Sequence, residues 1–549
     1  MKNNLILLII TLLLNFTYSQ TVGLIQHDSG SLDDGYVLFA PNNSTTTYLV
    51  NKCGKQVKTW PSTYRPGQSV YLLPDGTLLR TGNTNNTTFT AGGTGGIIQK
   101  IDWNGNVTWS YTISDATKCQ HHDVKALPNG NVLIIAWELK TNTQAIAAGI
   151  NPTQVPTTLW SEQIIEVQPI GSNGGNIVWE WHLWDHLIQN YDNTKLNYDT
   201  SIANNPQLVN LNFQASATNS DWIHLNSIDY NPTLDQILLS SHNFDEIWII
   251  DHSTTTSEAA LHLGGNSRKG GDLLYRWGNP QAYENGSSAN QKLFGQHNAR
   301  WIEAGFPFEN EIMVFNNGIG RPGGNYSTVE IINPPVNGAT YTATLPYLPT
   351  TTSWNYNYGN PNSLYSQNIS GAQPLSNGNV LICSGSSGTF TETTSSGAQV
   401  WKYINPVNNL GIINQGTNPL QNAVFRCTYY PTNYSGFNGH SLTAGSTIEN
   451  SNTVVASCNL TLENETFALN NEIKIYPNPA SDFITIDFGL TNEKLNINLI
   501  NSLGQTIKKT EITMGITSSK INIEDLSVGV YFLIISNESN SKTYKVIIE

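Results

Sequence analysis

Charged residues are scarce in this chain: they make up 12% of its 549 residues, and 40 acidic residues outnumber 26 basic ones. The formal net charge is −14, and no stretch gathers Lys and Arg into a basic patch. Nucleic-acid binding needs such a patch, so we expect no nucleic-acid partner. The composition is instead rich in Gly, Asn, Thr and Ser, which favours a turn-rich, all-β fold over a helical one.

Cysteine is also rare, and the spacing of the five cysteines disfavours a zinc site. The five cysteines form no C-x-x-C pair, which disfavours a zinc site built on cysteines. In an exported chain, an odd number allows up to two disulfides and leaves at least one thiol free. A chain of this length can bury a hydrophobic core without disulfides.

Long apolar runs are missing from all but the first residues. Residues 5–14 are apolar, follow Lys2 and precede small and polar residues, which is the pattern of a secretory signal peptide. We predict a signal peptide over residues 1–19, with cleavage near Ser19 or Gln20. No later segment is apolar over the length needed to cross a bilayer. We therefore expect an exported protein, secreted or at the cell surface, without a membrane span.

A repeated hairpin is the strongest pattern in the remaining chain. It recurs in "QSVYLLPDGTLLRTG" (68–82), "HDVKALPNGNVLIIAWE" (122–138), "HLNSIDYNPTLDQILLSSH" (224–242), "HNARWIEAGFPFENEIMVF" (297–315) and "SGAQPLSNGNVLICSG" (370–385). Each unit is a strand, a turn of Pro, Asn, Asp or Gly, and a more apolar strand. Most units precede two further strand-like segments, and four strands per repeat are typical of a β-propeller blade. Because residues 35–60 indicate a sixth unit, we predict a six-bladed β-propeller over residues 20–450.

A second domain is predicted after a polar linker at residues 451–470. Residues 471–549 contain short alternating strands, which predict a small β-sandwich. The motifs "YPNPASD" (476–482), "NSLGQ" (501–505) and "LSVGVYFL" (526–533) resemble the C-terminal sorting domain of type IX secretion substrates. The resemblance implies transport across a Gram-negative outer membrane by the type IX secretion machinery, and later removal of the domain. A carbohydrate-binding sandwich is the alternative.

One position of the hairpin repeat carries histidine in three units. His122, His224 and His297 each stand eight residues before the Gly or Pro of the turn, where the other two units have Gln68 and Ser370. Equivalent positions of a propeller lie around its axis, so we expect these side chains at the central channel. A single histidine would be interpreted as a core residue. Three converging imidazoles with few carboxylates indicate an anion site, and not the carboxylate pair of a glycoside hydrolase.

The repeats also carry a family resemblance. The stretches "QHHDVKALPNGNVLI", "DWIHLNSIDYNPTLDQILLSSH", "LLYRWGNPQAY", "FGQHNARWIEAGFPFENEIMVFNNG" and "SGAQPLSNGNVLI", in this order, resemble the bacterial aryl-sulfate sulfotransferases. The resemblance covers most of residues 35–435 and implies a six-bladed propeller. It implies ping-pong transfer of a sulfuryl group from a phenolic sulfate ester to a phenol, through a sulfohistidine and without a nucleotide donor, a cofactor or a metal.

The resemblance also assigns roles to residues of this chain. His297 of "FGQHN" matches the nucleophile that carries the sulfuryl group. His224 and Asn226 of "HLNS" match contacts to the sulfate of the donor. His122 of "HHDV" matches a further sulfate contact, with His121 as the alternative register. Ser370 is a further candidate for the channel.

One position departs from the family pattern. The family has an arginine at the end of the strand after "HLNS", whereas this chain has His242 in "SSHN". Arginine is always charged and binds two oxygens at once, but histidine at neutral pH is mostly neutral and offers one donor. We therefore expect weaker or more pH-dependent sulfate binding, or assistance from Arg300 or Arg321. A sulfatase-like hydrolase and a non-catalytic propeller that binds a surface ligand or partner are the alternative functions.

His182 and His186 are candidate metal ligands. In "WEWHLWDHLIQNYD" (179–192), His182 and His186 would share one face of a helix and could pair on zinc. The segment lacks the H-E-x-x-H pattern, so an amphipathic insert over the channel is the favoured interpretation. The basic loop "GGNSRKGGD" (264–272) is interpreted as an ordinary loop. The histidines that match no repeat position are expected to be structural; they are His27, His252, His262 and His440.

Overall fold

The computed structural model describes residues 20–356, 364–451, 458, 473–488, 494–501, 505–513, 515–536 and 541–549. The chain divides into two compact units, Met1–Cys458 and Asn459–Glu549. The predicted signal peptide (1–19) and nearly all of the predicted linker (451–470) lie outside the described residues. All five cysteines are described, and each is a free thiol.

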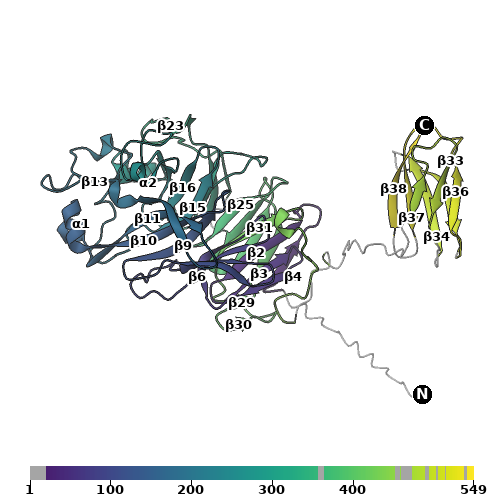
Figure 1. Cartoon of the computed structure of the whole chain (residues 1–549), viewed down its shortest axis with the longest axis horizontal. Helices are drawn as coiled ribbons and strands as arrows, with labels where there is room; N and C mark the ends of the chain where they lie inside the picture. The colour runs from purple at the N-terminus through teal and green to yellow at the C-terminus, as the bar shows by residue number, and fades with distance from the viewer. Residues whose placement is uncertain are drawn as a thin grey trace, which may run out of the picture. The chain divides into compact units, whose positions relative to one another are not determined.

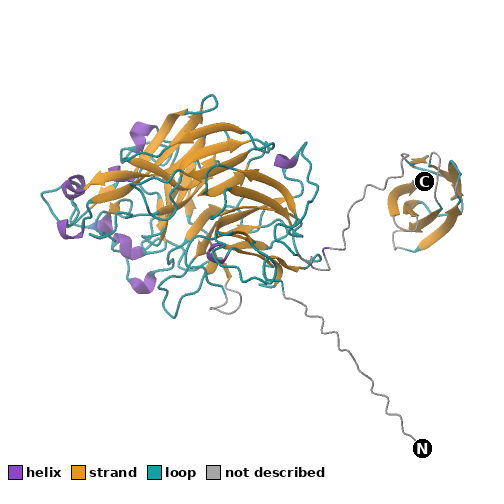
Figure 2. Ribbon diagram, turned by 90° about the horizontal axis from the view of Figure 1, so that it is seen from below, coloured by secondary structure: helices purple, strands orange, loops and turns teal. Residues whose placement is uncertain are grey.

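Six antiparallel sheets of four or five strands build the described part of the first unit (Figures 1 and 2). From the innermost strand outward, the first sheet contains β31 (Val424–Pro431), β2 (Gly35–Pro41), β3 (Thr46–Asn51) and β4 (Gln56–Pro61). The second contains β5 (Pro66–Leu72), β6 (Leu78–Asn83), β7 (Gly96–Ile101) and β8 (Val107–Thr112). The third contains β9 (Lys118–Ala126), β10 (Val132–Thr141), β11 (Thr158–Pro169) and β12 (Gly175–His182).

The other three sheets repeat this meander. The fourth contains β15 (Leu225–Asn231), β16 (Gln236–Ser241), β17 (Glu246–Asp251) and β18 (Tyr275–Trp277). The fifth contains β19 (His297–Trp301), β20 (Ile312–Asn316), β21 (Thr328–Ile332) and β24 (Trp354–Tyr356). The sixth contains β25 (Gly371–Pro374), β26 (Val380–Ser384), β27 (Thr389–Thr393), β28 (Gln399–Ile404) and β1 (Gly23–His27).

Short elements connect the sheets, and most of the short helices in Figure 2 lie at the edges of the unit. Two-residue strands pair as β13 (Leu187–Ile188) with β14 (Val209–Asn210), β22 (Val336–Asn337) with β23 (Thr340–Tyr341), and β29 (Val407–Asn408) with β30 (Gly411–Ile412). The α-helices are α1 (Asn142–Ala148) and α2 (Thr256–Ala259). The 3₁₀ helices are η1 (Pro152–Gln154), η2 (Leu183–Asp185), η3 (Ile202–Asn204), η4 (Pro280–Tyr283), η5 (Ser288–Asn290), η6 (Gly385–Ser387) and η7 (Ser435–Phe437).

The innermost strands close into a ring. They contact one another in the order β31, β5, β9, β15, β19, β25 and again β31, so we interpret each sheet as a blade around a common axis. The prediction of an all-β propeller followed by a small β-sandwich is confirmed. In the first sheet, however, β31 from the C-terminal side of the unit is innermost, and β2 is second. Strands from both ends of the unit therefore share a sheet, which closes the ring.

The innermost strands are bent where they reach the predicted site. Residues with positive φ occur at Gln68 (100°), His122 (51°), His224 (57°), Asn298 (54°) and Ser370 (92°). Such a conformation is unfavourable for residues with a Cβ and is often found at functional sites. In the fifth sheet it falls on Asn298, one residue after His297. The turn after β19 is longer than the others, so counting back from the turn places His297 one residue off the position of His122 and His224.

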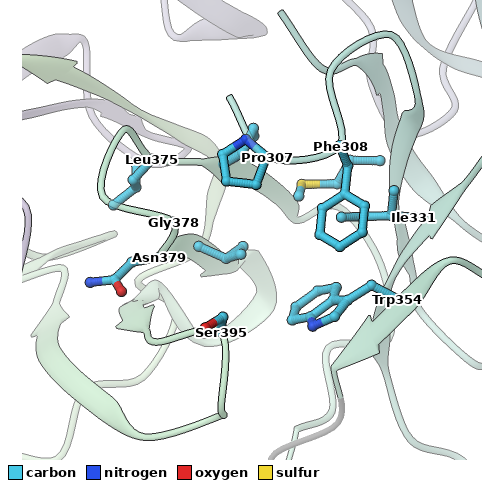
Figure 3. Close-up of a pocket in the computed structure, with 11 residues that line it drawn as sticks. Pro307, Phe308, Ile331, Trp354, Leu375, Gly378, Asn379 and Ser395 are labelled. Carbon is cyan, nitrogen blue, oxygen red and sulfur yellow. The ribbon is translucent and has the colours of Figure 1, made fainter. Parts of the chain in front are cut away.

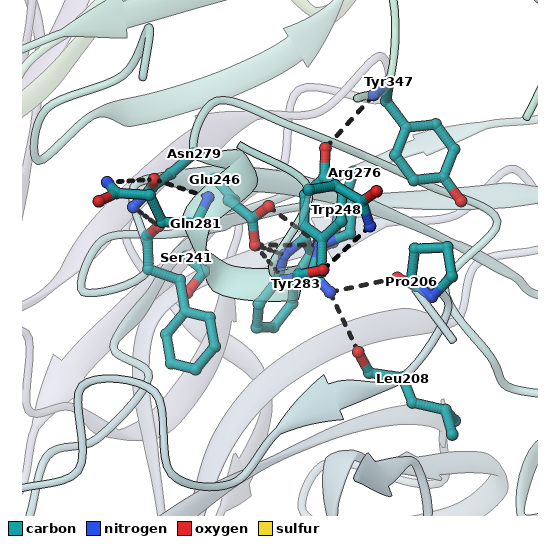
Figure 4. A network of polar contacts seen from close by, with 12 residues as sticks. Pro206, Leu208, Ser241, Glu246, Trp248, Arg276, Asn279, Gln281, Tyr283 and Tyr347 are labelled. Atoms are coloured by element: carbon teal, nitrogen blue, oxygen red, sulfur yellow. Dashed lines mark hydrogen bonds and ion pairs between the residues drawn. The ribbon is translucent and has the colours of Figure 1, made fainter. Parts of the chain in front are cut away.

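A buried ion pair supports the fourth sheet (Figure 4). Arg276 of β18 pairs with Glu246 of β17, and both side chains are fully buried. Arg276 Nη1 also donates to the carbonyl oxygens of Pro206 and Leu208, at 3.2 and 3.0 Å. Because a buried charge needs partners for all its donors, this network fixes the outer strand to the segment before β15. It also holds the start of β17, where the carbonyl oxygen of Glu246 accepts a hydrogen bond from Gln296 Nε2 at 2.8 Å.

His252 ties the third sheet to the fourth and predicts a pH-dependent stability. Its Nε2 lies 3.0 Å from Glu166 Oε2 of β11, and its Nδ1 lies 2.7 Å from Asp235 Oδ1. Burial lowers the pKa of His252, but hydrogen bonds and charges from Asp235 and Glu166 outweigh it and raise the pKa to about 9. An unfolded histidine has a pKa near 6.5, so the stabilisation is complete below about pH 6.5 and is lost as pH rises towards 9.

We expect the propeller to lose about 3 kcal/mol of unfolding free energy between pH 6.5 and pH 9.5 through this group. All 14 tryptophans lie before residue 459, so tryptophan fluorescence in urea reports the unfolding of this unit alone. In His252→Gln the difference between the two pH values should shrink by that amount. An equal pH dependence in the variant and the wild type would contradict the assignment.

The second unit is a β-sandwich in its described part. One sheet contains β32 (Lys474–Tyr476), β33 (Phe483–Asp487) and β36 (Ser518–Asn522). The other contains β35 (Thr506–Ile512), β34 (Leu495–Asn501), β37 (Gly529–Ser536) and β38 (Ser541–Ile548). Alternate residues of β34 are buried, as expected for strands with one face in a core. Isoleucine, leucine and valine from both sheets form that core.

Candidate active site

Four histidines form a continuous row at the inner ends of the third, fourth and fifth sheets. The ring centroids of His122 and His224 are 4.5 Å apart, those of His224 and His242 are 5.1 Å apart, and those of His242 and His297 are 5.4 Å apart. The structure therefore brings together His122, His224 and His297, which the sequence repeat singled out, and adds His242 between two of them. His121 lies behind His122, with their Nδ1 atoms 2.8 Å apart.

The tautomer of His297 is set by Asn317. The Nδ2 of Asn317 donates to the carbonyl oxygens of Ser366 and Ile369, at 2.7 and 3.0 Å. Its Oδ1 is therefore the atom that lies 2.8 Å from His297 Nδ1, and an amide oxygen can only accept. His297 consequently carries its proton on Nδ1, and the lone pair is on Nε2. That nitrogen accepts a long hydrogen bond of 3.2 Å from the backbone N–H of Ile369.

The backbone at His297 is held by the neighbouring residue and by the fourth sheet. Gln296 Nε2 donates to the carbonyl oxygens of Ser241 and Glu246, at 2.9 and 2.8 Å. Asn226 Nδ2 donates to the carbonyl oxygen of Gln296 at 2.7 Å. Asn226 is fully buried, and its Oδ1 has no hydrogen-bond partner. The structure thus uses the amide nitrogen of Asn226, a predicted sulfate contact, to position the strand that carries His297.

His297 is neutral at physiological pH. Burial is the main cause that holds its pKa well below the ordinary value, and the neighbouring His242 and His224 add to the shift. Its side chain is only 2% exposed. A neutral imidazole with a fixed N–H on one side and a lone pair on the other is a competent nucleophile.

His224 differs from the other three histidines of the row because it pairs with a carboxylate. Its Nδ1 lies 2.5 Å from Asp221 Oδ2. Burial lowers the pKa of His224, but the charge and hydrogen bond of Asp221 outweigh this effect and raise the pKa above the ordinary value. The same pairing lowers the pKa of Asp221 in spite of its burial. The row therefore contains one imidazole that favours the protonated state.

His122 is the end of a buried chain of polar groups. Burial raises the pKa of Glu162 well above the ordinary value of a glutamic acid. Burial also lowers the pKa of His121 well below the ordinary value of a histidine. Both groups are therefore neutral near pH 7. Glu162 Oε2 lies 2.8 Å from His121 Nε2, and Leu225 N–H donates to the other carboxyl oxygen. The neutral acid can donate to His121, which then donates through Nδ1 to His122. This order leaves the Nε2–H of His122 as a free donor.

His242 occupies the place that the family resemblance gives to arginine. Its Nδ1 donates to Asn243 Oδ1 at 2.8 Å. Burial, reinforced by the charge of His224, lowers the pKa of His242 to about 4. His242 is therefore neutral at physiological pH and, with Nδ1–H committed to Asn243, presents the lone pair of Nε2. The site thus lacks the permanent charge of a guanidinium at this position.

The remaining predicted site residues lie outside the row. Arg321 pairs with Glu330 at 3.6 Å and packs against the rings of Tyr326 and Phe294. Arg300 lies 3.8 Å from Glu303. The hydroxyl of Ser370 is buried, donates to Ser366 Oγ at 2.8 Å and accepts from Gly385 N–H at 3.0 Å. Among the described residues, no hydrogen bond, ion pair or ring contact joins these three residues to the histidine row.

Three residues of the site were not recognised from the sequence. Asn317 belongs to the "NNG" that ends the quoted "FGQHN" stretch, and only the contact of its Oδ1 with His297 Nδ1 reveals its role. Asp221 directly precedes "WIHLNS", so its spacing of three residues from His224 was an available signal. Glu162 lies in β11, 41 positions from His121, and no local pattern connects the two residues.

A hollow lined largely by apolar side chains lies away from this site. The hollow has a volume of about 240 Å³. Its lining includes Pro307, Phe308, Ile331, Trp354, Leu375 and Asn379 (Figure 3). None of the histidines lines it. Its residues come from strands and turns of the fifth and sixth sheets.

Comparisons with solved structures give only distant likenesses. A protein of unknown function from Bacteroides caccae is 12% identical, with a TM-score of 0.38, over 72% of this chain and 99% of that chain. Virginiamycin B lyase from Staphylococcus aureus is 11% identical, with a TM-score of 0.32, over 70% of this chain and 89% of that chain.

Comparison with the sequences of curated proteins gives a partial match. An endo-acting ulvan lyase from Formosa agariphila is 33% identical over 84 residues, which are 15% of this chain and 16% of that enzyme.

Two family models match this chain. The arylsulfotransferase (ASST) model matches residues 57–434, which include the whole histidine row. The model of the secretion system C-terminal sorting domain matches residues 474–549, which form the β-sandwich. None of the helices in the described ranges has the length and hydropathy needed to cross a bilayer. The chain therefore belongs to the arylsulfotransferase family and carries a type IX secretion C-terminal sorting domain.

Proposed function

We propose that this protein transfers a sulfuryl group from an aryl sulfate to a phenol, with His297 as the residue that carries the group between the two half-reactions. The observation that supports this proposal best is the hydrogen bond between His297 Nδ1 and Asn317 Oδ1. It holds the proton on Nδ1 and so leaves the lone pair of a buried, neutral imidazole on Nε2. A neutral nucleophile suits an anionic sulfate ester, because no charge repulsion opposes its approach.

The first half-reaction would proceed by in-line displacement at sulfur. The lone pair of His297 Nε2 forms the N–S bond while the bond from sulfur to the aryl oxygen breaks, and its electron pair leaves on the phenolate oxygen. In the second half-reaction, the oxygen of the acceptor phenol attacks sulfur and the N–S bond breaks. Charge stays distributed over the sulfuryl oxygens, so the protein contributes positioning and electrostatic stabilisation.

His224 and His122 would supply the donors that this charge requires. The imidazolium of His224, stabilised by Asp221, can donate its proton to the departing phenolate and take a proton from the acceptor phenol. His122, supported by His121 and Glu162, would donate its Nε2–H to a sulfuryl oxygen without carrying charge. All of these groups belong to this chain, and no metal or cofactor enters the scheme.

His242 would limit the affinity for the donor. We expect His242→Arg to lower KM for an aryl sulfate by roughly fivefold to tenfold, because a charged hydrogen bond to sulfate is worth about 1 kcal/mol more than a neutral one. His242→Gln is the matched neutral variant, and its KM should stay close to that of the wild type. The test is steady-state kinetics on a chromogenic aryl sulfate at pH 7. An unchanged or higher KM in His242→Arg would show that the sulfate does not approach this position.

The function is tested by measuring release of a chromogenic phenol from its sulfate ester with and without an acceptor phenol. The proposal predicts sustained turnover only when the acceptor is present, together with formation of the sulfated acceptor. Sustained release without an acceptor would instead identify a sulfatase-like hydrolase. Donor binding by well-folded protein without any turnover would support the non-catalytic alternative, for which the missing arginine is the specific observation.

Export completes the proposal. The sorting-domain match supports export and secretion or cell-surface attachment. We propose that the type IX secretion machinery recognises the β-sandwich and that the propeller then meets its aryl sulfate donors and phenolic acceptors outside the outer membrane. The predicted signal peptide at residues 1–19 would direct the first export step.

A further inference from the structure

A second group of converging side chains lies at the outer edges of the third and fourth sheets. His186 follows η2 after the outermost strand β12, and Asp272 precedes the outermost strand β18. Asp272 Oδ1 lies 2.9 Å from His186 Nδ1 and 2.7 Å from His262 Nδ1. The three ligand atoms all lie within 4.8 Å of one another. Two imidazole nitrogens and one carboxylate oxygen therefore lie close enough together to bind one ion.

The tautomer of His186 leaves its lone pair at that point. His186 Nε2 lies 2.8 Å from the carbonyl oxygen of Ala259, which can only accept, so this nitrogen carries a proton. In a neutral imidazole, the bare nitrogen is then Nδ1, and it faces the carboxylate oxygen of Asp272. Two lone pairs at 2.9 Å require a cation or a proton between them. A histidine that ligates a metal commonly donates its other N–H to a backbone carbonyl in this way.

The ring of His186 is held in place from both sides. Trp181 stacks on it with the ring centroids 5.6 Å apart and the planes within 5°, and Trp181 Nε1 donates to the carbonyl oxygen of Gly271 at 2.7 Å. A Cβ at Gly271 would lie 2.5 Å from His186 Nε2 and 2.0 Å from the carbonyl oxygen of Ala259. Residue 271 must therefore be glycine for the imidazole and its acceptor to fit. The first ligand is built into the fold and fully buried.

We propose that His186, His262 and Asp272 bind a Zn²⁺ ion. Two imidazoles and a carboxylate are a donor set that zinc prefers, and a water molecule would complete the tetrahedron. His262 is 59% exposed, so the ion can enter from solvent, while His186 and Asp272 are buried. The ion would clasp the segment after β12 to the loop 260–274 and so join the outer edges of two blades. None of the three proposed ligands belongs to the histidine row.

His182 does not belong to this site, although it is four residues from His186. Its Nδ1 lies 3.1 Å from Glu138 Oε2, and its Nε2 lies 3.6 Å from Glu180 Oε2. The segment forms the end of β12 and the 3₁₀ helix η2, not the helix that would have placed the two histidines on one face. His182→Ala is therefore a matched control that removes a nearby imidazole and leaves the proposed ligands intact.

The test counts zinc by equilibrium dialysis on tag-free protein of the full mature chain. Because His27, Cys53 and Cys458 form a second group that could hold a metal, the parent for all variants carries Cys53→Ser. We expect one bound Zn²⁺ per chain in this parent and in its His182→Ala variant. His262→Ala and Asp272→Asn should each weaken zinc binding by about tenfold or more. Co²⁺ in place of zinc should give the visible absorption of a tetrahedral site only where the ligands are intact.

Two results would overturn the proposal. One is a parent that binds no zinc, which would make the cluster an ordinary set of hydrogen bonds. The other is equal zinc binding by the parent and the ligand variants. His262 is exposed, so its replacement should not prevent folding, and tryptophan fluorescence of the apo variants checks this directly.

Discussion

Replacing His297 with alanine is expected to abolish phenol-dependent turnover of an aryl sulfate, with a fall in kcat of about 10⁴-fold or more. The reason is that the proposed group transfer needs a lone pair at the position of His297 Nε2, and alanine has none. Removing the residue that we propose forms the covalent intermediate would leave only binding and electrostatic stabilisation. The measurement is the initial rate with saturating donor and acceptor.

The matched control for this experiment is His440→Ala. His440 stacks on Trp103 with ring centroids 4.2 Å apart and has no contact with the histidine row among the described residues. Its replacement should leave kcat within about twofold of the wild type, as surface substitutions usually do. If His297→Ala kept a tenth or more of the wild-type rate while folded, another residue would have to carry the sulfuryl group.

The second large effect is expected for Asp221→Asn. The carboxylate raises the pKa of His224 against the effect of burial, so the wild type keeps His224 protonated above pH 6.5. Activity that depends on this proton should be present below the raised pKa and should fall as pH increases through it. Without the charge of Asp221, burial alone would lower the pKa of His224, and the alkaline limb of the pH–rate profile should move to lower pH. At pH 7 we expect kcat to fall by about 10²–10³-fold.

The pH profile separates this role from simple loss of structure. If Asp221→Asn only disturbed the structure, it would lower the rate equally at every pH and leave the alkaline limb of the profile in place. His224→Gln, which cannot titrate, should lose the alkaline limb altogether. A profile of Asp221→Asn with the same limb as the wild type would contradict the assignment of His224 as the proton donor and acceptor.

The sequence repeat made much of the fold predictable. The hairpin turns such as "LPNG" and "LSNG" predicted pairs of strands that the structure contains as β9–β10 and β25–β26. The closure of the ring could not be read in the same way, because β31 and β2 are nearly 390 residues apart in the chain and neither carries a signal for the other. Local patterns predict a hairpin, whereas the pairing of distant strands follows from the geometry of the whole propeller.

The histidine row shows the same division. The repeat placed His122, His224 and His297 at one level of the structure, and the structure brings them together. The sequence repeat could not predict that Asn298, and not His297, adopts the positive φ in the fifth sheet. The turn after β19 is longer there, so counting back from the turn is off by one residue. Nor could the repeat assign Asn317 or Glu162, whose roles arise from a hydrogen bond across strands and from burial.

The most direct test of the central claim is to isolate the sulfurylated protein. The tryptic peptide 293–300, "LFGQHNAR", contains His297 as its sole histidine. Protein mixed with excess aryl sulfate and no acceptor, then quenched at alkaline pH, should yield this peptide with the added mass of one SO₃ group on the histidine. A brief addition of phenol before the quench should remove it. Release of phenol from the donor with the peptide unmodified, or with the group on another residue, would contradict a sulfohistidine at His297.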